Sequence, residues 1–358
     1  MGLTTTTANG PQLNNTGQGI LGVSYRQDEA ATLNGLQTTP TIYEQMVDQG
    51  LIDRSAYSLY LNDAENGEGS VLFGGVDSSK YRDDLVVLPL QPLSGKPPAF
   101  WVALTNISFT DDEGTHALTG DDFQGVAAIL DSGSTDMQLP NDVFNNLIKG
   151  LGAVIGDISD GVPGVPCSLI EDNKAGISLQ FGGTDGPLME VPLSAMINSK
   201  TRKSVGGIDF CLLSVGPSLG GLVILGDAFL RSFYIVYDIA NNQIALATAV
   251  LNATGTPSIA NIPTGTSIPG ATSTATLMLP TTTANATTTV APITSYFGVG
   301  SATFSLGALS TSGGSSASAT ARPSSNAALA SVSTSNGIMW LGSLLCSFMG
   351  VYGPSGIL

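Results

Sequence analysis

Basic residues and histidine are scarce in this chain. Its 358 residues include 12 Lys and Arg and one His against 28 Asp and Glu, a formal net charge of −16. Nucleic-acid binding needs a basic face, so nucleic acid is not expected as a partner. The one histidine, His116, follows a polar stretch and is expected at the surface. No zinc-ligand spacing exists and no Ser or Cys triad can be built, so no metal or other cofactor is expected.

Charged and aromatic residues are also few, at 11% and 6%, whereas 42% of the residues are apolar. The 44 Gly and 19 Pro, with many Val, Ile, Thr and Ser, favour short strands and turns, so the fold class should be mainly β. Short helices are predicted at 40–50, ended by Gly50, and at 140–148, capped by Asn141 or Asp142. Strands are predicted at 57–61, 71–73, 85–90, 101–104, 127–130, 177–181, 188–193, 209–215, 222–225, 233–238 and 242–248.

The composition changes sharply near residue 250. Residues 251–337 are Thr, Ser, Ala, Gly and Pro with almost no charge and few large apolar groups. Such a segment cannot bury enough area to offset its ordering entropy. We expect a disordered stalk that carries O-glycans.

The last residues, 338–358, are hydrophobic and short for a membrane span. Small residues at 325–328 and a polar spacer precede them, which is the order of a GPI-attachment signal. Asn326 is the first candidate for the anchored residue and Ser325 the second; a simple C-terminal membrane anchor is the alternative. The protein is therefore expected on the outer face of the plasma membrane or in the cell wall. Four sequons give candidate N-glycosylation sites at Asn14, Asn106, Asn252 and Asn285.

A secretory route needs an entry signal, yet Met1 is followed by no basic n-region and no apolar h-region. We expect from this that an N-terminal part of the protein is missing from the sequence. Residues 1–18 then form only a polar remnant.

The most informative stretch is the apolar run 127–130 that stops at Asp131, followed by Ser132, Gly133, Ser134 and Thr135. A buried strand would fix the carboxylate rigidly, and Gly133 would allow a tight turn with close approach to it. The hydroxyls and turn amides can hydrogen-bond the ionised acid and orient it. The pattern resembles the catalytic loop of a pepsin-family aspartic protease.

Further motifs extend the resemblance. They are the segment Gly19-Ile20-Leu21-Gly22-Val23, the stretch from Gln49 to Leu61, the hairpin Gly69–Asp77, and the closing motif Ile224–Asp238. The tail makes the fungal surface-anchored yapsins the nearest group. The resemblance implies the C-terminal lobe of the bilobal fold at 56–250, with the end of the N-terminal lobe and the crossover at 19–55.

The family works through two carboxylates that share one proton, because like charges so close cannot both ionise. A search of the chain finds a single Asp-Ser/Thr-Gly loop. We therefore expect an aspartic endopeptidase of acidic pH whose chain, as given, lacks the first catalytic Asp and does not cleave peptides. A lone Asp131 in a solvated half-cleft should be an ordinary acidic carboxylate. The alternatives are a non-catalytic protease-like surface glycoprotein and, ranked last, a pair of chains that supplies two Asp131 groups.

The resemblance also assigns roles. Ser132 corresponds to the hydroxyl that grips the opposite loop, Ser134 to the one that steadies the carboxylate, and Thr135 to a residue lining the cleft. Asp136 and Asp227 are expected to be solvated or turn residues. A disulfide between Cys167 and Cys211, usual in this lobe, is expected over two free thiols, with Cys346 left in the tail. The expected partners are peptide substrates and a membrane, and the full-length protein should be a monomer.

Overall fold

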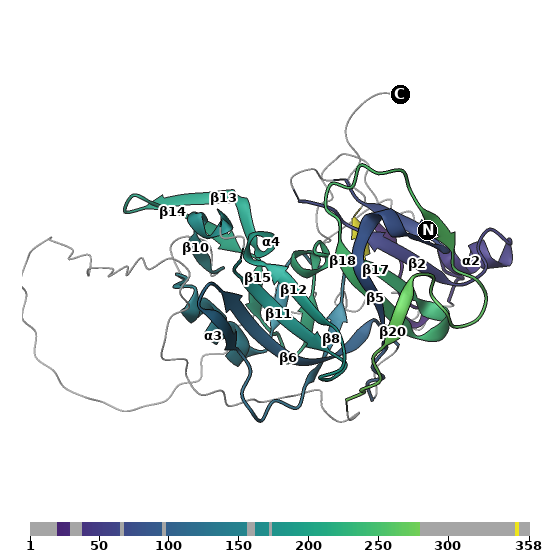
Figure 1. Cartoon of the computed structure of the whole chain (residues 1–358), viewed down its shortest axis with the longest axis horizontal. Helices are drawn as coiled ribbons and strands as arrows, with labels where there is room; N and C mark the ends of the chain where they lie inside the picture. Colours follow the sequence, from purple (N-terminus) through teal and green to yellow (C-terminus); the bar gives the residue numbers. More distant parts are fainter. Residues whose placement is uncertain are drawn as a thin grey trace, which may run out of the picture.

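The computed structural model describes residues 20–28, 38–64, 68–94, 98–155, 162–171 and 174–279, and the backbone of 348–350. Two large β-sheets lie side by side and form the framework of this part of the chain (Figure 1). The chain is mainly β, as predicted, and its described α-helices are α2 (Ile42–Asp48), α3 (Asn141–Gly150), α4 (Leu193–Met196) and α5 (Asp227–Leu230).

The eight-stranded sheet holds the predicted catalytic loop. Its strands, in spatial order, are β12 (Leu188–Pro192), β11 (Gly176–Phe181), β6 (Trp101–Asp111), β8 (Val126–Leu130), β16 (Val223–Leu225), β9 (Met137–Leu139) and β15 (Val215–Pro217), with β7 (Gly114–Ala117) paired to β6. All five residues of β8 are buried, as expected for an apolar run inside a sheet. Most neighbours are antiparallel, but β16 runs parallel to β8 and β15 parallel to β9.

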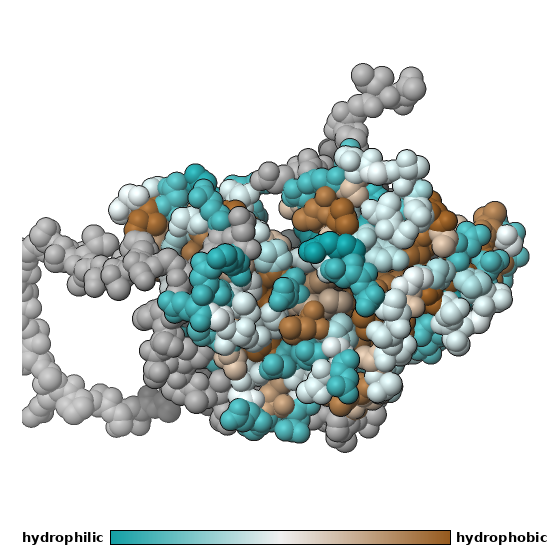
Figure 2. All heavy atoms as spheres, viewed as in Figure 1, coloured by the Kyte–Doolittle hydropathy of each residue, from teal (hydrophilic) through white to brown (hydrophobic). Residues whose placement is uncertain are grey.

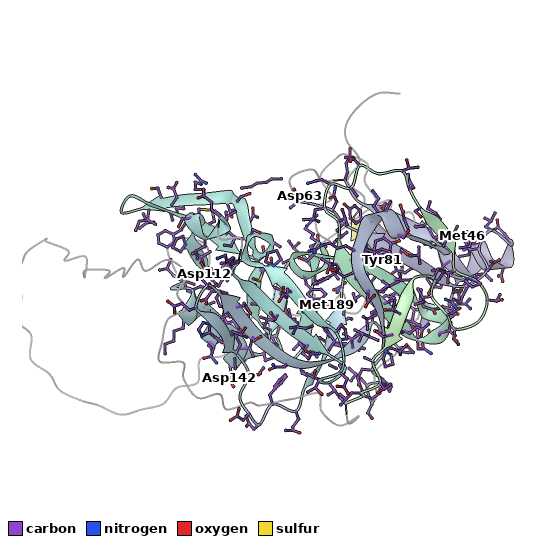
Figure 3. The ribbon with its side chains drawn as sticks, in the orientation of Figure 1. Met46, Asp63, Tyr81, Asp112, Asp142 and Met189 are labelled. Atoms are coloured by element: carbon purple, nitrogen blue, oxygen red, sulfur yellow. A yellow bond between two sulfur atoms is a disulfide. The ribbon has the colours of Figure 1, made fainter. Side chains whose placement is uncertain are left out.

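The six-stranded sheet lies beside it. Its order is β20 (Ala271–Thr274), β5 (Tyr81–Pro89), β18 (Gln243–Ala249), β17 (Phe233–Asp238), β2 (Ala56–Tyr60) and β3 (Ser70–Phe73). Side chains alternate along β17: Ile235 and Tyr237 join the main core, whereas Tyr234 and Val236 join a second apolar cluster on the other face. Figure 3 marks the two sheets by Met189 on β12 and Tyr81 on β5.

The smaller sheets and pairs complete the described part. A three-stranded sheet contains β10 (Gly164–Pro166), β14 (Ile208–Leu213) and β13 (Ile197–Val205). The disulfide Cys167–Cys211 ties this sheet to the adjoining 3-10 turn Cys167–Glu171, which confirms the predicted pairing. Two-stranded pairs join β4 (Gly75–Asp77) to β19 (Ile259–Asn261) and β1 (Ile20–Gly22) to β21 (Phe348–Gly350).

The two long helices lie where predicted, but one cap differs. Thr41 caps α2 in a capping box with Glu44, and Gly50 follows the helix with φ +70°. At α3 the capping position belongs to Pro140, which makes no side-chain cap bond, so the prediction of Asn141 or Asp142 as the cap is wrong. The proline fixes a φ that suits the entry of a helix, so the chain turns helical one residue earlier than a capping Asn would allow.

The predicted stalk needs a correction at its start. Residues 251–279 are described and packed: β19 pairs with β4 and β20 pairs with β5. Ile262, Ile268 and Leu279 are buried, so a few apolar residues among many Thr, Gly and Pro suffice to dock the segment. Residues 280–337, the remainder of the predicted stalk, lie outside the described residues, as do Ser325 and Asn326.

The surface mixes polar and apolar groups. On the face seen in Figure 2, hydrophobic residues lie between polar ones and do not form one continuous apolar patch. The exposed large apolar side chains come from separate parts of the chain; they include Leu51, Ile155, Leu188, Leu219 and Ile259. Within the described ranges, no helix has the length and apolar character required to cross a bilayer.

Candidate active site

The parallel pair of β8 and β16 builds the site. Leu130 and Leu225 are in register, so the residues that follow each strand leave the sheet side by side. The backbone N–H of Asp131 donates to the Leu225 carbonyl at 3.1 Å and extends the pairing by one residue. Asp131 and the Gly226-Asp227 pair are therefore neighbours although 95 residues separate them in the sequence.

The Asp131 carboxylate is held by its own loop. The Gly133 N–H donates to Oδ1 at 2.9 Å and the Ser134 hydroxyl donates to Oδ2 at 2.8 Å. The residue is 5% exposed. Burial raises the pKa of Asp131, and the bonds from Gly133 and Ser134 oppose that rise. The expectation of an ordinary, solvated, acidic carboxylate is therefore wrong, because the strand and the turn bury it more than a half-cleft would suggest.

Gly226 is required because two backbones approach closely there. A Cβ at this position would overlap the Ser134 carbonyl and lie 2.5 Å from the Asp136 carbonyl. The next two amides, of Asp227 and Ala228, donate to the carbonyls of Ser134 and Thr135 at 2.8 and 3.1 Å. The loop 131–135 is thus held against the first turn of α5, and its shape depends on the closing motif.

The sequence predicts that Asp227 is a solvated or a turn residue. It lies where the chain turns from β16 into α5, but it is not solvated: about three quarters of its side chain is covered, and Arg231 Nη2 lies 3.3 Å from its Oδ2. Burial raises its pKa to about 6; Arg231 lowers it, and Asp131 and Asp136 raise it further. Asp227 lies two residues after β16, and its nearness to Asp131 comes from the parallel pairing of β16 with β8, which the local sequence does not show.

Aromatic side chains form the floor beneath the loop. Tyr237 of β17 stacks on Tyr57 of β2 at 4.8 Å between ring centroids and packs on Phe100 at 4.5 Å. The Phe100 carbonyl accepts the N–H of Leu130, the last residue of β8. Burial, followed by the charges of Asp131 and Asp227, raises the pKa of Tyr237. The six-stranded sheet therefore supports the strand that carries Asp131.

The remaining predicted residues are spread differently. Ser132 is half-buried, whereas Gly133, Thr135 and Asp136 are exposed around the turn. His116 lies on β7, 3.2 Å from Asp111, away from the parallel pair. The described residues contain no group of three acidic, His or Cys side chains able to hold a metal ion.

The sequon asparagines Asn106 and Asn252 are both exposed. Asn106 lies on β6, and Asn252 follows β18. Asn14 and Asn285 lie outside the described residues, as does Cys346.

A site of this construction has known counterparts. The family of eukaryotic aspartyl proteases matches residues 1–249. This chain belongs to the pepsin family of aspartic proteases. It is 38% identical over 238 residues to the "Probable aspartic-type endopeptidase opsB" of Aspergillus fumigatus, an alignment that covers 66% of this chain and 48% of that protein. It is also 38% identical over 206 residues to "Aspartic proteinase yapsin-3" of Saccharomyces cerevisiae, covering 56% of this chain and 38% of that one.

The fold agrees with a solved family structure. The aspartic proteinase from Irpex lacteus superposes with a TM-score of 0.53 at 23% identity, covering 65% of this chain and 68% of that one. The chain spans about half the length of the first curated relatives it matches. The similarity therefore fixes the family and the fold, and the activity of a whole protein is a separate question.

Proposed function

We propose that this pepsin-family chain contributes one catalytic carboxylate, Asp131, to an aspartic endopeptidase that acts at acidic pH. The geometry of that carboxylate carries the proposal. It follows a fully buried strand, and one oxygen takes a backbone N–H while the other takes the Ser134 hydroxyl. A carboxylate that must contact both a water molecule and a peptide carbonyl in one geometry has to be held in a fixed orientation.

In this chemistry two carboxylates share one proton and hold a water between them. The ionised carboxylate takes a proton as the water attacks the peptide carbonyl, and the protonated one donates to the carbonyl oxygen. Cleavage of the C–N bond then needs a proton on the leaving nitrogen. The turn at Gly133 and Ser134 would fix Asp131 for either step, and the dyad titrates as a pair rather than as two separate acids.

The second carboxylate must come from another Asp-Thr/Ser-Gly loop, since the 358 residues hold a single such loop. We propose that it belongs to the opposite lobe of the family fold, with Ser132 facing that loop and Thr135 lining the cleft. The body that carries Asp131 would be the C-terminal lobe at residues 56–250, preceded by the crossover at 19–55.

A chimera tests this proposal. The complementary lobe of the Aspergillus fumigatus relative, with its own Asp-Thr/Ser-Gly loop, is joined ahead of residue 19 of this chain. The expected result is hydrolysis of a fluorogenic peptide at acidic pH, blocked by an aspartic-protease transition-state inhibitor. Asp131→Asn in the chimera should lower kcat/KM by at least about a thousandfold, since one shared proton cannot be replaced by an amide.

The matched control is Asp121→Asn, which neutralises an exposed carboxylate near the start of β8 and should leave kcat/KM unchanged. A folded, inhibitor-binding chimera whose activity survives Asp131→Asn would contradict the role of Asp131. A folded chimera with no activity would favour the second candidate, a protease-like surface glycoprotein without catalysis. Inhibitor-sensitive cleavage by the unmodified chain alone would show that two copies complete the dyad.

We also propose a secretory route and a lipid-anchored place at the cell surface. Support comes from the disulfide, which suits an oxidising compartment, and from the exposed sequon residues Asn106 and Asn252. Asn326 is the proposed anchor site. Release of the protein from intact cells by a phosphatidylinositol-specific phospholipase, lost on Asn326→Gln with Ser325→Gln, is the expected outcome; unchanged release would contradict the anchor.

A further inference from the structure

Residues 251–279, which follow the part matched by the family, run over both sheets. The segment leaves β18 and pairs with β4 through β19. It then crosses the edge of the six-stranded sheet and pairs in parallel with β5 through β20. It ends beside Gly125, the residue before β8. We call this segment, residues 251–279, the clasp.

Apolar side chains anchor the first half of the clasp. Ile262 is 0% exposed and Ile268 is 4% exposed, and both belong to the cluster on the outer face of the six-stranded sheet. The Ile262 N–H donates to the Gly74 carbonyl at 2.8 Å. Burial of these two isoleucine side chains stabilises the docked segment and offsets the ordering of a stretch otherwise rich in Thr, Ser and Gly.

A buried polar lock holds the middle of the clasp. The Arg54 guanidinium, 4% exposed, donates to the carbonyls of Gly265 and Ser267 and contacts the Asp238 carboxylate at 3.3 Å. Asn241 and Gln243 each donate to Asp238 and also to a clasp carbonyl, those of Gly265 and Thr266. A buried cation needs such partners, and the clasp carbonyls supply acceptors for both terminal nitrogens of the Arg54 guanidinium.

The last part of the clasp joins the two sheets. The Ala275 N–H donates to Val87 of β5 at 2.9 Å, while a Cβ on Gly182, beyond β11, would lie 2.5 Å from the Ala275 Cβ. The buried side chain of Gln91 then makes two bonds with the Leu279 backbone, donating to its carbonyl at 2.9 Å and accepting its N–H at 2.8 Å. Gly182 leaves the space that the Ala275 side chain occupies, and the Gln91 amide supplies both the donor and the acceptor for the Leu279 backbone.

We propose that the clasp is an integral part of the folded body that carries Asp131, so that this folded unit ends at about residue 279 rather than 250. Any cleavage that frees the body from the Ser/Thr-rich tail would then occur after Leu279. The polar lock ends at Asp238, directly after Tyr237 in the aromatic floor, so the clasp stabilises the support of the Asp131 strand. The proposal concerns the fold of the lobe and stands whether or not Asp131 is catalytic.

Hydrogen exchange on the unmodified full-length chain is the first test. The amides of Ile262, Ala275 and Leu279, all bonded to the body, should exchange at least about a hundredfold more slowly than in a free peptide. Exchange at free-peptide rates throughout 251–279 would overturn the proposal. This measurement needs no variant and therefore cannot be confused with a folding failure.

A matched pair of variants provides the second test. Ile262→Asp places a charge in the buried anchor, whereas Ile259→Asp makes the same change three residues earlier at a side chain that is 57% exposed. Limited proteolysis of the full chain, with cuts located by mass spectrometry, should find Ile262→Asp cleaved within 251–279 at least tenfold faster. Ile259→Asp should be cleaved like the unmodified chain, in which cuts at 251–279 are slow.

Equal cleavage of both variants and the unmodified chain within 251–279 would overturn the proposal. Should Ile262→Asp fail to fold, Gln91→Ala removes only the clamp on Leu279. It should open cleavage at the end of the clasp and leave the region around Ile262 resistant. Gln124→Ala, at an exposed glutamine, is its control.

Discussion

At the scale of single residues, two acidic side chains have pKa values above that of a surface carboxylate. Asp131 and Asp227 both follow buried strands, and burial raises the pKa of each. The apolar run before Asp131 predicted its rigid place. Nothing in the local sequence showed the burial of Asp227, because that burial comes from the parallel pairing of β8 with β16. Arg54 escaped notice for the same reason, since its partners lie more than 180 residues away.

Asp227 predicts a pH dependence of stability. Its pKa in the folded state is raised to about 6, so the folded protein takes up a proton there more readily than the unfolded chain. Its contribution to stability is full below about pH 4 and is lost as the pH rises through 6. As the pH rises from 4 to 7, the free energy of unfolding of the Asp227→Asn variant should therefore increase by about 1–3 kcal/mol relative to that of the unmodified protein.

Urea denaturation of both proteins at pH 4 and pH 7 measures this difference. Comparing the same two proteins at two pH values isolates the part of the difference that depends on ionisation of Asp227, and the opposing effect of Arg231 is already included in the raised pKa. A difference that is equal at both pH values, or that changes in the opposite direction, would contradict the raised pKa.

At the scale of elements, most of the predicted strands lie within two residues of a strand in the structure, because apolar alternation and buried runs are visible in the sequence. β5 begins at Tyr81 rather than 85, β6 continues to Asp111 rather than 104, and the short strands β7, β9 and β10 were not predicted. The prediction missed β13, whose nine residues are mostly exposed and polar and pair with β14 through an irregular register. It also missed β19, whose three residues are Ile-Ala-Asn, and β20, whose four are Ala-Thr-Ser-Thr, because both are short and lack apolar alternation. These strands exist because a neighbouring edge pairs with them, and such tertiary pairing overrides composition.

The close contact between the loop 131–135 and the start of α5 gives a prediction at this scale. Gly226→Ala should lower the free energy of unfolding by about 2–4 kcal/mol, because its Cβ would overlap the Ser134 carbonyl and force the two backbones apart. Thermal and urea unfolding measure the loss.

Gly216→Ala is the matched control, since nothing lies within 4 Å of a Cβ there. It should change stability by less than about 1 kcal/mol. If both glycine variants were equally stable, the close approach at Gly226 would be without consequence for the fold.

At the scale of the whole molecule, the two sheets share one core, and few covalent ties hold it. The disulfide Cys167–Cys211 joins residues 44 apart. In the chain-entropy description, closing a loop of that length stabilises the fold by about 4 kcal/mol. This bond could be predicted from the family resemblance and from the cysteine count, since two of the three cysteines lie in the body and the third in the tail.

Replacing both cysteines by alanine should therefore cost about 2–4 kcal/mol of unfolding free energy. The unmodified protein under strong reductant should lose a similar amount, and the double variant should be insensitive to the reductant. An equal Tm with and without reductant in the unmodified protein would show that the bond adds no stability.

The route of the clasp has a mechanical consequence. The chain leaves it at Leu279, beside the start of β8, while Asp131 lies at the other end of that strand, roughly 17 Å away for five residues. Tension on a tail attached to a wall or membrane would enter the body at this far end. It would first have to break the Gln91 clamp and the β20–β5 pairing before reaching β18. The loop that holds Asp131 would then carry no load, and the tail could be pulled without distorting it.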